Sequence, residues 1–189
     1  MIKKYIRSFI GLIVCKRFRI TYKTIPFVGL RMKVVNQMGG KIICGSNVSF
    51  SSDTYLFNVT PFANISFGNN IRIAHHFQIS CAKSIIIKSN VNIAPFVFIT
   101  DHNHAYEDVS QPIMNQGILF NNDARILIEE GSWIGTKVTI VGNVKIGRHC
   151  VIGANSVVTK DIPDYSIAAG IPCKVIKHYD FIKKEWVKG

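Results

Sequence analysis

The feature that most constrains the fold is a period of six among the aliphatic residues of the C-terminal half. Stepping by six from residue 128, every position carries a β-branched aliphatic side chain: Ile128, Ile134, Ile140, Ile146, Ile152 and Val158. An α-helix repeats its apolar face every 3.6 residues and a plain strand every two, so neither predicts a strict six. Such a repeat indicates a solenoid, in which each short side of a coil buries one of these residues.

The same register returns upstream. Two further sets are spaced by six, with a shift of two residues at 84–87 between them: Phe67, Ile73 and Ile79, then Ile87, Ile93 and Ile99. Before residue 61 the pattern decays. Glycines at 135, 147 and 153 directly follow aliphatic positions. We expect short parallel strands stacked coil on coil, with glycine and asparagine at the corners because they tolerate positive φ.

The hexads at 128–162 resemble the left-handed parallel β-helix of hexapeptide-repeat proteins, and three motifs narrow the resemblance. These are GSWIG at 131–135, VIGANSVVTKDIP at 151–163 and AAGIPCKVI at 168–176. They are similar to the sugar O-acetyltransferases of the maltose, galactoside, capsule and O-antigen kind, over about residues 65–178. The resemblance implies a mainly β fold, a single-stranded left-handed parallel β-helix with an extruded catalytic loop and short terminal helices.

Three parts of the chain are predicted on this basis. Residues 1–40 form a basic N-terminal segment that is partly helical, residues 41–170 form the β-helix with its loop at 100–125, and residues 171–189 form a C-terminal tail or helix. The resemblance also implies a homotrimer with active sites between subunits. One subunit would give the loop histidine, and its neighbour would complete the coenzyme slot.

The period of six breaks between residues 99 and 126, and polar side chains gather at this break. It begins Thr100-Asp101-His102-Asn103-His104. A polar insert in a regular coil must loop outward, and catalytic groups often lie on such loops. Histidine suits a general base near neutral pH. In the family a loop histidine follows the motif at 90–95 (NVNIAP) at a fixed distance, and an ungapped count from that motif reaches His104 rather than His102.

The resemblance further implies acetyl-CoA as co-substrate. The positions that match the family's coenzyme contacts are Thr136, Ala154, Thr159, Lys160 and Lys174. Small side chains at 136 and 154 would let the pantetheine arm approach the backbone, and the two lysines would meet phosphates as point charges. Relatives carry arginine at the last basic positions, where this chain has Lys174 and Lys177.

Metal binding is the main alternative for the histidines. His75, His76, His102 and His104 include enough ring nitrogens for a zinc ion. The gamma-class carbonic anhydrases share the β-helix and use three histidines in this way. That class lacks the coenzyme tail found here at 158–163 and 169–174. We therefore predict no metal site.

The charge of +12 is unevenly placed. Residues 1–52 hold ten Lys and Arg and no Asp or Glu. Basic ends favour anionic partners. Nucleic acid is disfavoured because aromatic residues are not interleaved with basic ones and no binding motif is found.

The apolar run at 9–15 is too short to span a bilayer, and basic residues follow it where a signal peptide would have a cleavage site. This segment predicts either a helix on an anionic membrane surface or a helix packed on its own domain.

Cysteine usage favours a reducing compartment. There are five cysteines, an odd number with no CxxC pair, at 15, 44, 81, 150 and 173. We predict a cytoplasmic protein that can work at the inner face of the membrane. Its predicted function is acetyl transfer from acetyl-CoA to a sugar hydroxyl in surface-polysaccharide assembly (O-antigen or capsule), with His104 as general base. An N-acetyltransferase acting on a nucleotide-linked amino sugar needs the same base and slot, so the sequence does not separate the two. It does not indicate the acceptor sugar.

Overall fold

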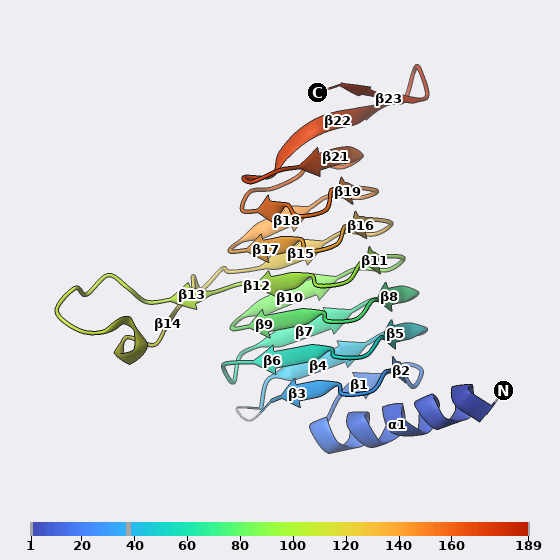
Figure 1. The fold of residues 1–189 in the computed structure, drawn as a ribbon, viewed down its shortest axis with the longest axis vertical. Coiled ribbons are helices and arrows are strands. Elements are labelled where there is room, and N and C mark those ends of the chain that lie inside the picture. The colour runs from blue at the N-terminus through green and yellow to red at the C-terminus, as the bar shows by residue number, and fades with distance from the viewer. Residues whose placement is uncertain (1, 37–38, 189) are drawn as a thin grey trace.

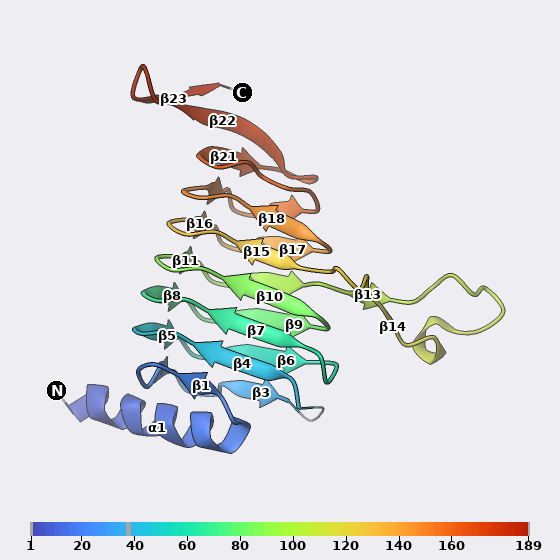
Figure 2. The ribbon, with the colours of Figure 1, turned by 180° about the vertical axis from the view of Figure 1, so that it is seen from behind.

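Each step of six carries the chain from one sheet to the next. In the computed structural model, which describes residues 2–36 and 39–188, three sheets run along the axis of a stack of coils, and strands of successive coils pair in parallel (Figures 1 and 2). Ile128 lies in sheet A, Ile134 in sheet B and Ile140 in sheet C. The next step returns to sheet A, where Ile146 pairs with Ile128. The predicted solenoid is confirmed.

The strands are short and follow the order A, B, C in every coil. Sheet A contains β1 (Thr21–Tyr22), β4 (Lys41–Cys44), β7 (Asn64–Phe67), β10 (Ser84–Ile87), β15 (Ile126–Ile128) and β18 (Val144–Ile146). Sheet B contains β2 (Phe27–Val28), β5 (Val48–Phe50), β8 (Ile71–Ile73), β11 (Asn92–Ile93), β16 (Trp133–Ile134), β19 (Val151–Ile152), β21 (Ser166–Ala169), β22 (Lys174–Asp180) and β23 (Glu185–Lys188). Sheet C contains β3 (Lys33–Val35), β6 (Tyr55–Asn58), β9 (Gln78–Cys81), β12 (Phe98–Thr100), β17 (Thr139–Val141) and β20 (Val157–Val158).

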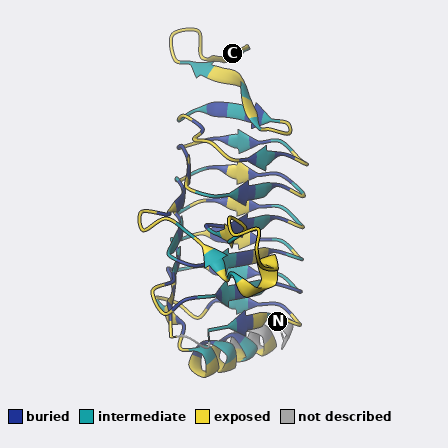
Figure 3. Ribbon diagram, turned by 90° about the vertical axis from the view of Figure 1, so that its left-hand side faces the viewer, coloured by how far each residue is buried: buried dark blue, intermediate teal, exposed yellow. Residues whose placement is uncertain are grey.

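The core is a set of aliphatic columns parallel to the axis. In sheet C, Ile79 pairs with Ile99, and Ile99 with Ile140. All three side chains are fully buried. Successive coils therefore cover one another's apolar side chains, and stability comes from stacking. Figure 3 shows buried residues recurring from coil to coil along the stack.

Asparagine and glycine hold positive φ at several corners, as expected, and other residue types hold it elsewhere. At the corner between sheets A and B, the left-handed position is held by Asn47, Asn70 and Asn90, with φ of 56°, 55° and 61°. Their side-chain amides form a ladder with hydrogen bonds of 3.1 Å. Between sheets B and C the same position holds residues of several types: Arg31, Asp53, His76, Phe96, Lys137 and Asn155. The stack therefore imposes this conformation on side chains that seldom adopt it alone.

Glycines after the aliphatic positions serve close approach between coils. Gly135 has no positive φ. A Cβ there would lie 2.6 Å from the carbonyl oxygen of Ile152 in the next coil. A residue with a side chain would push neighbouring coils apart, so glycine is needed for spacing at this position.

Both ends of the stack are covered. Helix α1 (Ile2–Phe18) packs against β2 at the N-terminal end, with Gly11 and Cys15 buried. Among the described residues, no helix has the length and hydropathy needed to cross a membrane. Strands β1–β3 already pair in register with the next coil, so the stack begins before the predicted boundary at residue 41.

The C-terminal segment, predicted to be a tail or a helix, contains two strands and no helix among its described residues. Residues 174–188 form the antiparallel strands β22 and β23. Strand β22 pairs with β21, the last strand that continues the coil in sheet B. The exposed edge of a strand has unpaired backbone N–H and C=O groups. A second strand can form hydrogen bonds with these groups, whereas the backbone groups of a helix are already paired within the helix. Residues 174–180 therefore form a strand because they pair with the open edge of the last coil.

Candidate active site

The interruption in the repeat is an extruded loop, as predicted. It leaves sheet C after β12 and returns to sheet A at β15, and it contains β13 (Asn103–His104), β14 (Ile118–Leu119) and the 3-10 helix η1 (Ile113–Asn115). Strands β13 and β14 form an antiparallel pair. The hairpin projects away from the stack at mid-height (Figure 1). The candidate histidines of the loop therefore lie either at its root, against the stack, or out on the hairpin.

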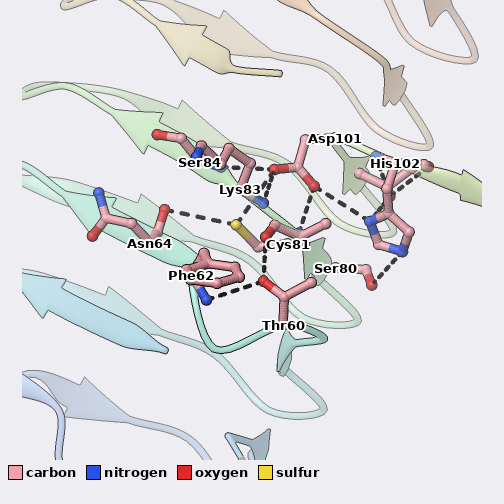
Figure 4. A network of polar contacts seen from close by, with 11 residues as sticks. Thr60, Phe62, Asn64, Ser80, Cys81, Lys83, Ser84, Asp101 and His102 are labelled. Atoms are coloured by element: carbon pink, nitrogen blue, oxygen red, sulfur yellow. Dashed lines mark hydrogen bonds and ion pairs between the residues drawn. The ribbon is translucent and has the colours of Figure 1, made fainter. Parts of the chain in front are cut away.

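Asp101 fixes the root of the loop. Its side chain is fully buried and accepts three backbone N–H bonds of 2.7–2.8 Å, from Ala82, Lys83 and Ser84 (Figure 4). Burial alone would raise the pKa of Asp101, but hydrogen bonds from His102 and the three amides outweigh it, so the pKa lies below its usual value. Asp101 is therefore a buried carboxylate that stays ionised.

The three amides lie at the shift of two residues seen in the sequence. Phe67 and Ile87 are partners in sheet A and lie 87 − 67 = 20 positions apart, whereas Ile128 and Ile146 lie 146 − 128 = 18 apart. The two extra residues lie in β9 and β10, which have four residues each against three in β17 and β18, and the corner between them is at residues 82–83. The irregularity thus flanks the backbone donors that hold the carboxylate of the next coil.

His102 is oriented by this carboxylate. Its Nδ1 lies 3.3 Å from Oδ1 of Asp101 and 3.2 Å from Oγ1 of Thr100, and its Nε2 lies 3.5 Å from Oγ of Ser80 (Figure 4). The side chain is 12% exposed. A neutral imidazole whose Nδ1–H points to a carboxylate leaves Nε2 as the basic nitrogen. The structure therefore gives His102 the surroundings of a general base.

His104 lies in a different setting. It is exposed on β13, where it pairs with Ile118. The hairpin holds its backbone, and the next residue continues the pairing through an N–H bond of Ala105 to the carbonyl of Gly117 at 3.1 Å. The two histidines are thus divided between the wall of the stack and the projecting hairpin.

The segment between β13 and β14 is ordered by the carboxylate of Asp108. Asp108 accepts hydrogen bonds from Ser110 and Gln111, at 2.6–2.9 Å, and these lower its pKa. Gln116 donates to the carbonyl of Asp108 at 2.8 Å. Large apolar side chains remain exposed in the loop, including Val109 (98%) and Met114 (85%). A structured loop with exposed apolar side chains is typical of a contact surface.

The predicted coenzyme positions lie along the upper coils. Thr136 and Ala154 occupy the corner between sheets B and C in successive coils, where the N–H of Asn155 bonds to the carbonyl of Thr136 at 2.9 Å. Thr159 and Lys160 follow β20, and Lys174 begins β22 beside it, because the N–H of Cys173 bonds to Val157 at 2.8 Å. All of these except the half-buried Thr136 are exposed. Four of the five thus lie around one strand, β20.

The fold does not bring together the four histidines that were considered as zinc ligands. His75 and His76 lie at the corner between sheets B and C, where His76 stacks on Phe96 with ring centroids 4.6 Å apart. The described part of the chain contains no group of three His, Cys, Asp or Glu side chains placed to hold a metal ion.

The sequence did not identify Asp101 as the group that orients a histidine, although its position next to His102 was a signal.

The repeat itself matches a known family profile, that of the bacterial transferase hexapeptide (six repeats), at residues 125–160. The chain is similar to this family over those residues. It is 35% identical over 128 residues to a putative lipopolysaccharide biosynthesis O-acetyl transferase, WbbJ, of Escherichia coli, a match that covers 66% of this chain and 65% of that protein. The first three curated relatives are matched by this chain over only 37–65% of their own lengths.

Solved structures of similar shape also exist. A maltose O-acetyltransferase from Clostridium difficile has a TM-score of 0.59 and 26% identity, covering 89% of this chain and 74% of that one. AntD, an N-acyltransferase from Bacillus cereus in complex with dTDP and coenzyme A, has a TM-score of 0.70 at 18% identity, covering 89% of each chain. These likenesses confirm the predicted fold, a left-handed parallel β-helix.

Proposed function

We propose that this protein transfers an acetyl group from acetyl-CoA to a hydroxyl group of a sugar. The observation that carries the proposal is the buried Asp101 beside His102 at the root of the loop, 3.3 Å apart. Support comes from relatives named as sugar O-acetyltransferases and from the exposed positions around β20 that match the family's coenzyme contacts. Surface-polysaccharide assembly is the proposed setting, in line with the name of the Escherichia coli relative.

The proposed mechanism needs one base and no covalent enzyme intermediate. The histidine Nε2 takes the proton of the acceptor hydroxyl as its oxygen attacks the thioester carbonyl. A new C–O bond forms, the C–S bond breaks, and the proton passes to the departing coenzyme A thiolate. The charge of Asp101 stabilises the imidazolium that forms between these steps. A positioned general base of this kind contributes roughly 10²–10⁴-fold in rate.

Two histidines compete for this role. Sequence spacing favours His104, whose exposed position on the hairpin would let it reach a site completed by a neighbouring subunit. Local geometry favours His102, which has an orienting carboxylate and a fixed ring. We place the base at His102 on this geometry and keep His104 as the second candidate, because the spacing supports it.

The coenzyme phosphates are proposed to bind the exposed lysines. In the described part of the chain neither Lys160 nor Lys174 forms an ion pair, so both are available to an anion. Thr136, Ala154 and Thr159 would line the pantetheine path. The arm can approach the backbone at these corner positions because their side chains are small.

Replacing Lys160 or Lys174 with alanine should raise the KM for acetyl-CoA about tenfold, since each lysine loses a charged hydrogen bond to phosphate. The KM for the acceptor should change little. Calorimetric titration with acetyl-CoA should show the same loss without catalysis. Lys183→Ala, an exposed lysine in the C-terminal turn, serves as the matched control. Unchanged coenzyme affinity in both variants would put the phosphates elsewhere.

An amine acceptor is the second candidate. It is favoured by the likeness in shape to AntD, an N-acyltransferase solved with dTDP and coenzyme A. The same histidine and coenzyme slot would serve an amino group on a nucleotide-linked sugar. Parallel assays with hydroxyl-only and amino sugars distinguish the two.

Assembly and location complete the proposal. A homotrimer would cover the exposed apolar side chains of the loop, such as Val109 and Met114, and would bring the loop to a neighbour's coil.

A cytoplasmic location is supported by the five free cysteines, four of them buried. Burial raises the pKa of the Cys15 thiol to about 11, which keeps it protonated and unreactive. A lipid-linked saccharide at the inner face of the membrane would be within reach there.

A further inference from the structure

Helix α1 has an apolar strip on its outward side. Ile6, Phe9, Leu12 and Ile13 are 53%, 64%, 39% and 51% exposed. Residues 6, 9 and 13 follow the spacing of one helical face. The opposite side carries the packing, because Gly11 and Cys15 are buried. A helix that only capped the stack would not need large apolar side chains on both sides.

Basic side chains lie at the C-terminal end of this strip. Lys16, Arg17 and Arg19 are exposed at the end of the helix. Beside them a hollow of about 880 Å³ is lined by Arg17, Arg19, Lys33 and Lys41, among other residues. Residues 1–52 contain no carboxylate side chain, and the first acid, Asp53, is already bonded to Arg31 at 2.6–2.7 Å. This end of the stack is therefore both apolar and positively charged.

We infer that this N-terminal surface binds an anionic lipid membrane, lying on it with the strip in the interface and the basic groups at the lipid phosphates. The combination of apolar side chains and neighbouring cations is that of interfacial helices. A second copy is a poorer occupant, because pairing two such ends would bring like charges together. Nucleic acid would satisfy the cations and leave the apolar strip without a partner.

The inference is independent of acetyl transfer. Helix α1 lies at one end of the stack, whereas the loop leaves it at mid-height (Figure 1). Lipid binding can therefore be measured, and can fail, whatever the enzyme assay gives.

The test is co-sedimentation of the full chain with phosphatidylcholine vesicles and with vesicles containing phosphatidylglycerol, at low and high salt. We expect binding to the anionic vesicles, weakened by salt. Phe9→Ser with Ile13→Ser should reduce it at least tenfold. Lys16→Gln with Arg17→Gln should reduce it about fivefold for each charge removed at low salt. The matched controls at the opposite end, Ile182→Ser and Lys183→Gln with Lys184→Gln, should bind like the wild type.

Circular dichroism and melting curves establish that the variants are folded, which is expected because the replaced side chains are exposed. Equal binding by the helix variants and the controls would overturn the inference. So would failure to bind anionic vesicles. A change in oligomer mass confined to the helix variants, without vesicle binding, would assign the strip to a second copy. Salt-dependent binding of an oligonucleotide in place of vesicles would assign the cations to nucleic acid.

Discussion

Replacing His102 with asparagine should lower the kcat of acetyl transfer by about 10²–10⁴-fold and leave the fold intact. The asparagine amide is short enough to keep a hydrogen bond to Asp101, which contacts Nδ1 of the native ring at 3.3 Å. It has no group at the position of Nε2, the nitrogen proposed to take the proton. Acetyl-CoA should still bind, because no coenzyme position is altered.

His104→Asn is the matched comparison, two residues further along the same segment. We expect it to retain activity within about tenfold of the wild type, since the ring of His104 is exposed and the hairpin can form without it. The reverse order, with an active His102 variant and an inactive His104 variant, would give the base to His104 as the spacing predicts. Full activity in both variants would remove the loop histidines from the mechanism.

Replacing Asp101 with alanine should have the largest effect on stability. Three backbone N–H groups would lose their acceptor inside the stack. Removing one partner from a buried charged network costs about 3–5 kcal/mol. For a chain of this length that corresponds to a melting temperature lower by about 10 °C. Activity should fall as well, because His102 would lose the group that orients its ring.

Asp123→Ala is the control, an exposed carboxylate in the same loop. It should melt within about 2 °C of the wild type, as surface substitutions usually do. A melting temperature unchanged by Asp101→Ala would show that the carboxylate does not hold the loop to the coil below.

The effect of Asp101 should also depend on pH. Its pKa is lowered in the folded protein, so its stabilisation is fully present above the pKa of an unfolded aspartate, near 4, and is lost as the pH falls through the lower folded value. The difference in unfolding free energy between wild type and Asp101→Ala should therefore be constant above about pH 5 and shrink below pH 4. Denaturant titrations at several pH values measure it.

The repeat was predictable because it is strict. Stepping by six from Ile128 places each residue in the next sheet, and the register of Ile128 with Ile146 follows directly. The two ends were less predictable, because their secondary structure is determined by pairing with the neighbouring coil and not by a sequence repeat. Strand β22 forms where an open edge needs partners, and β1–β3 form a coil without the sequence pattern that marks the later ones.

The candidate site was predictable in its location and not in its contacts. A single break in the repeat indicated the loop that carries Asp101, His102 and His104. The contacts of Asp101 depend on amides 17–19 residues earlier, at the corner between β9 and β10, and spacing alone does not describe these contacts.

The central claim is that this protein moves acetyl groups from acetyl-CoA to a sugar hydroxyl. The most direct measurement is release of free coenzyme A thiol by the purified full chain, with acetyl-CoA and a panel of simple, nucleotide-linked and lipid-linked saccharides, followed by mass spectrometry of the acceptor. We predict thiol release that requires a saccharide and a mass increase of one acetyl group on a hydroxyl-bearing acceptor. Acetylation confined to amino groups would make it an N-acetyltransferase, and no acceptor-dependent release with any class in the panel would contradict the claim.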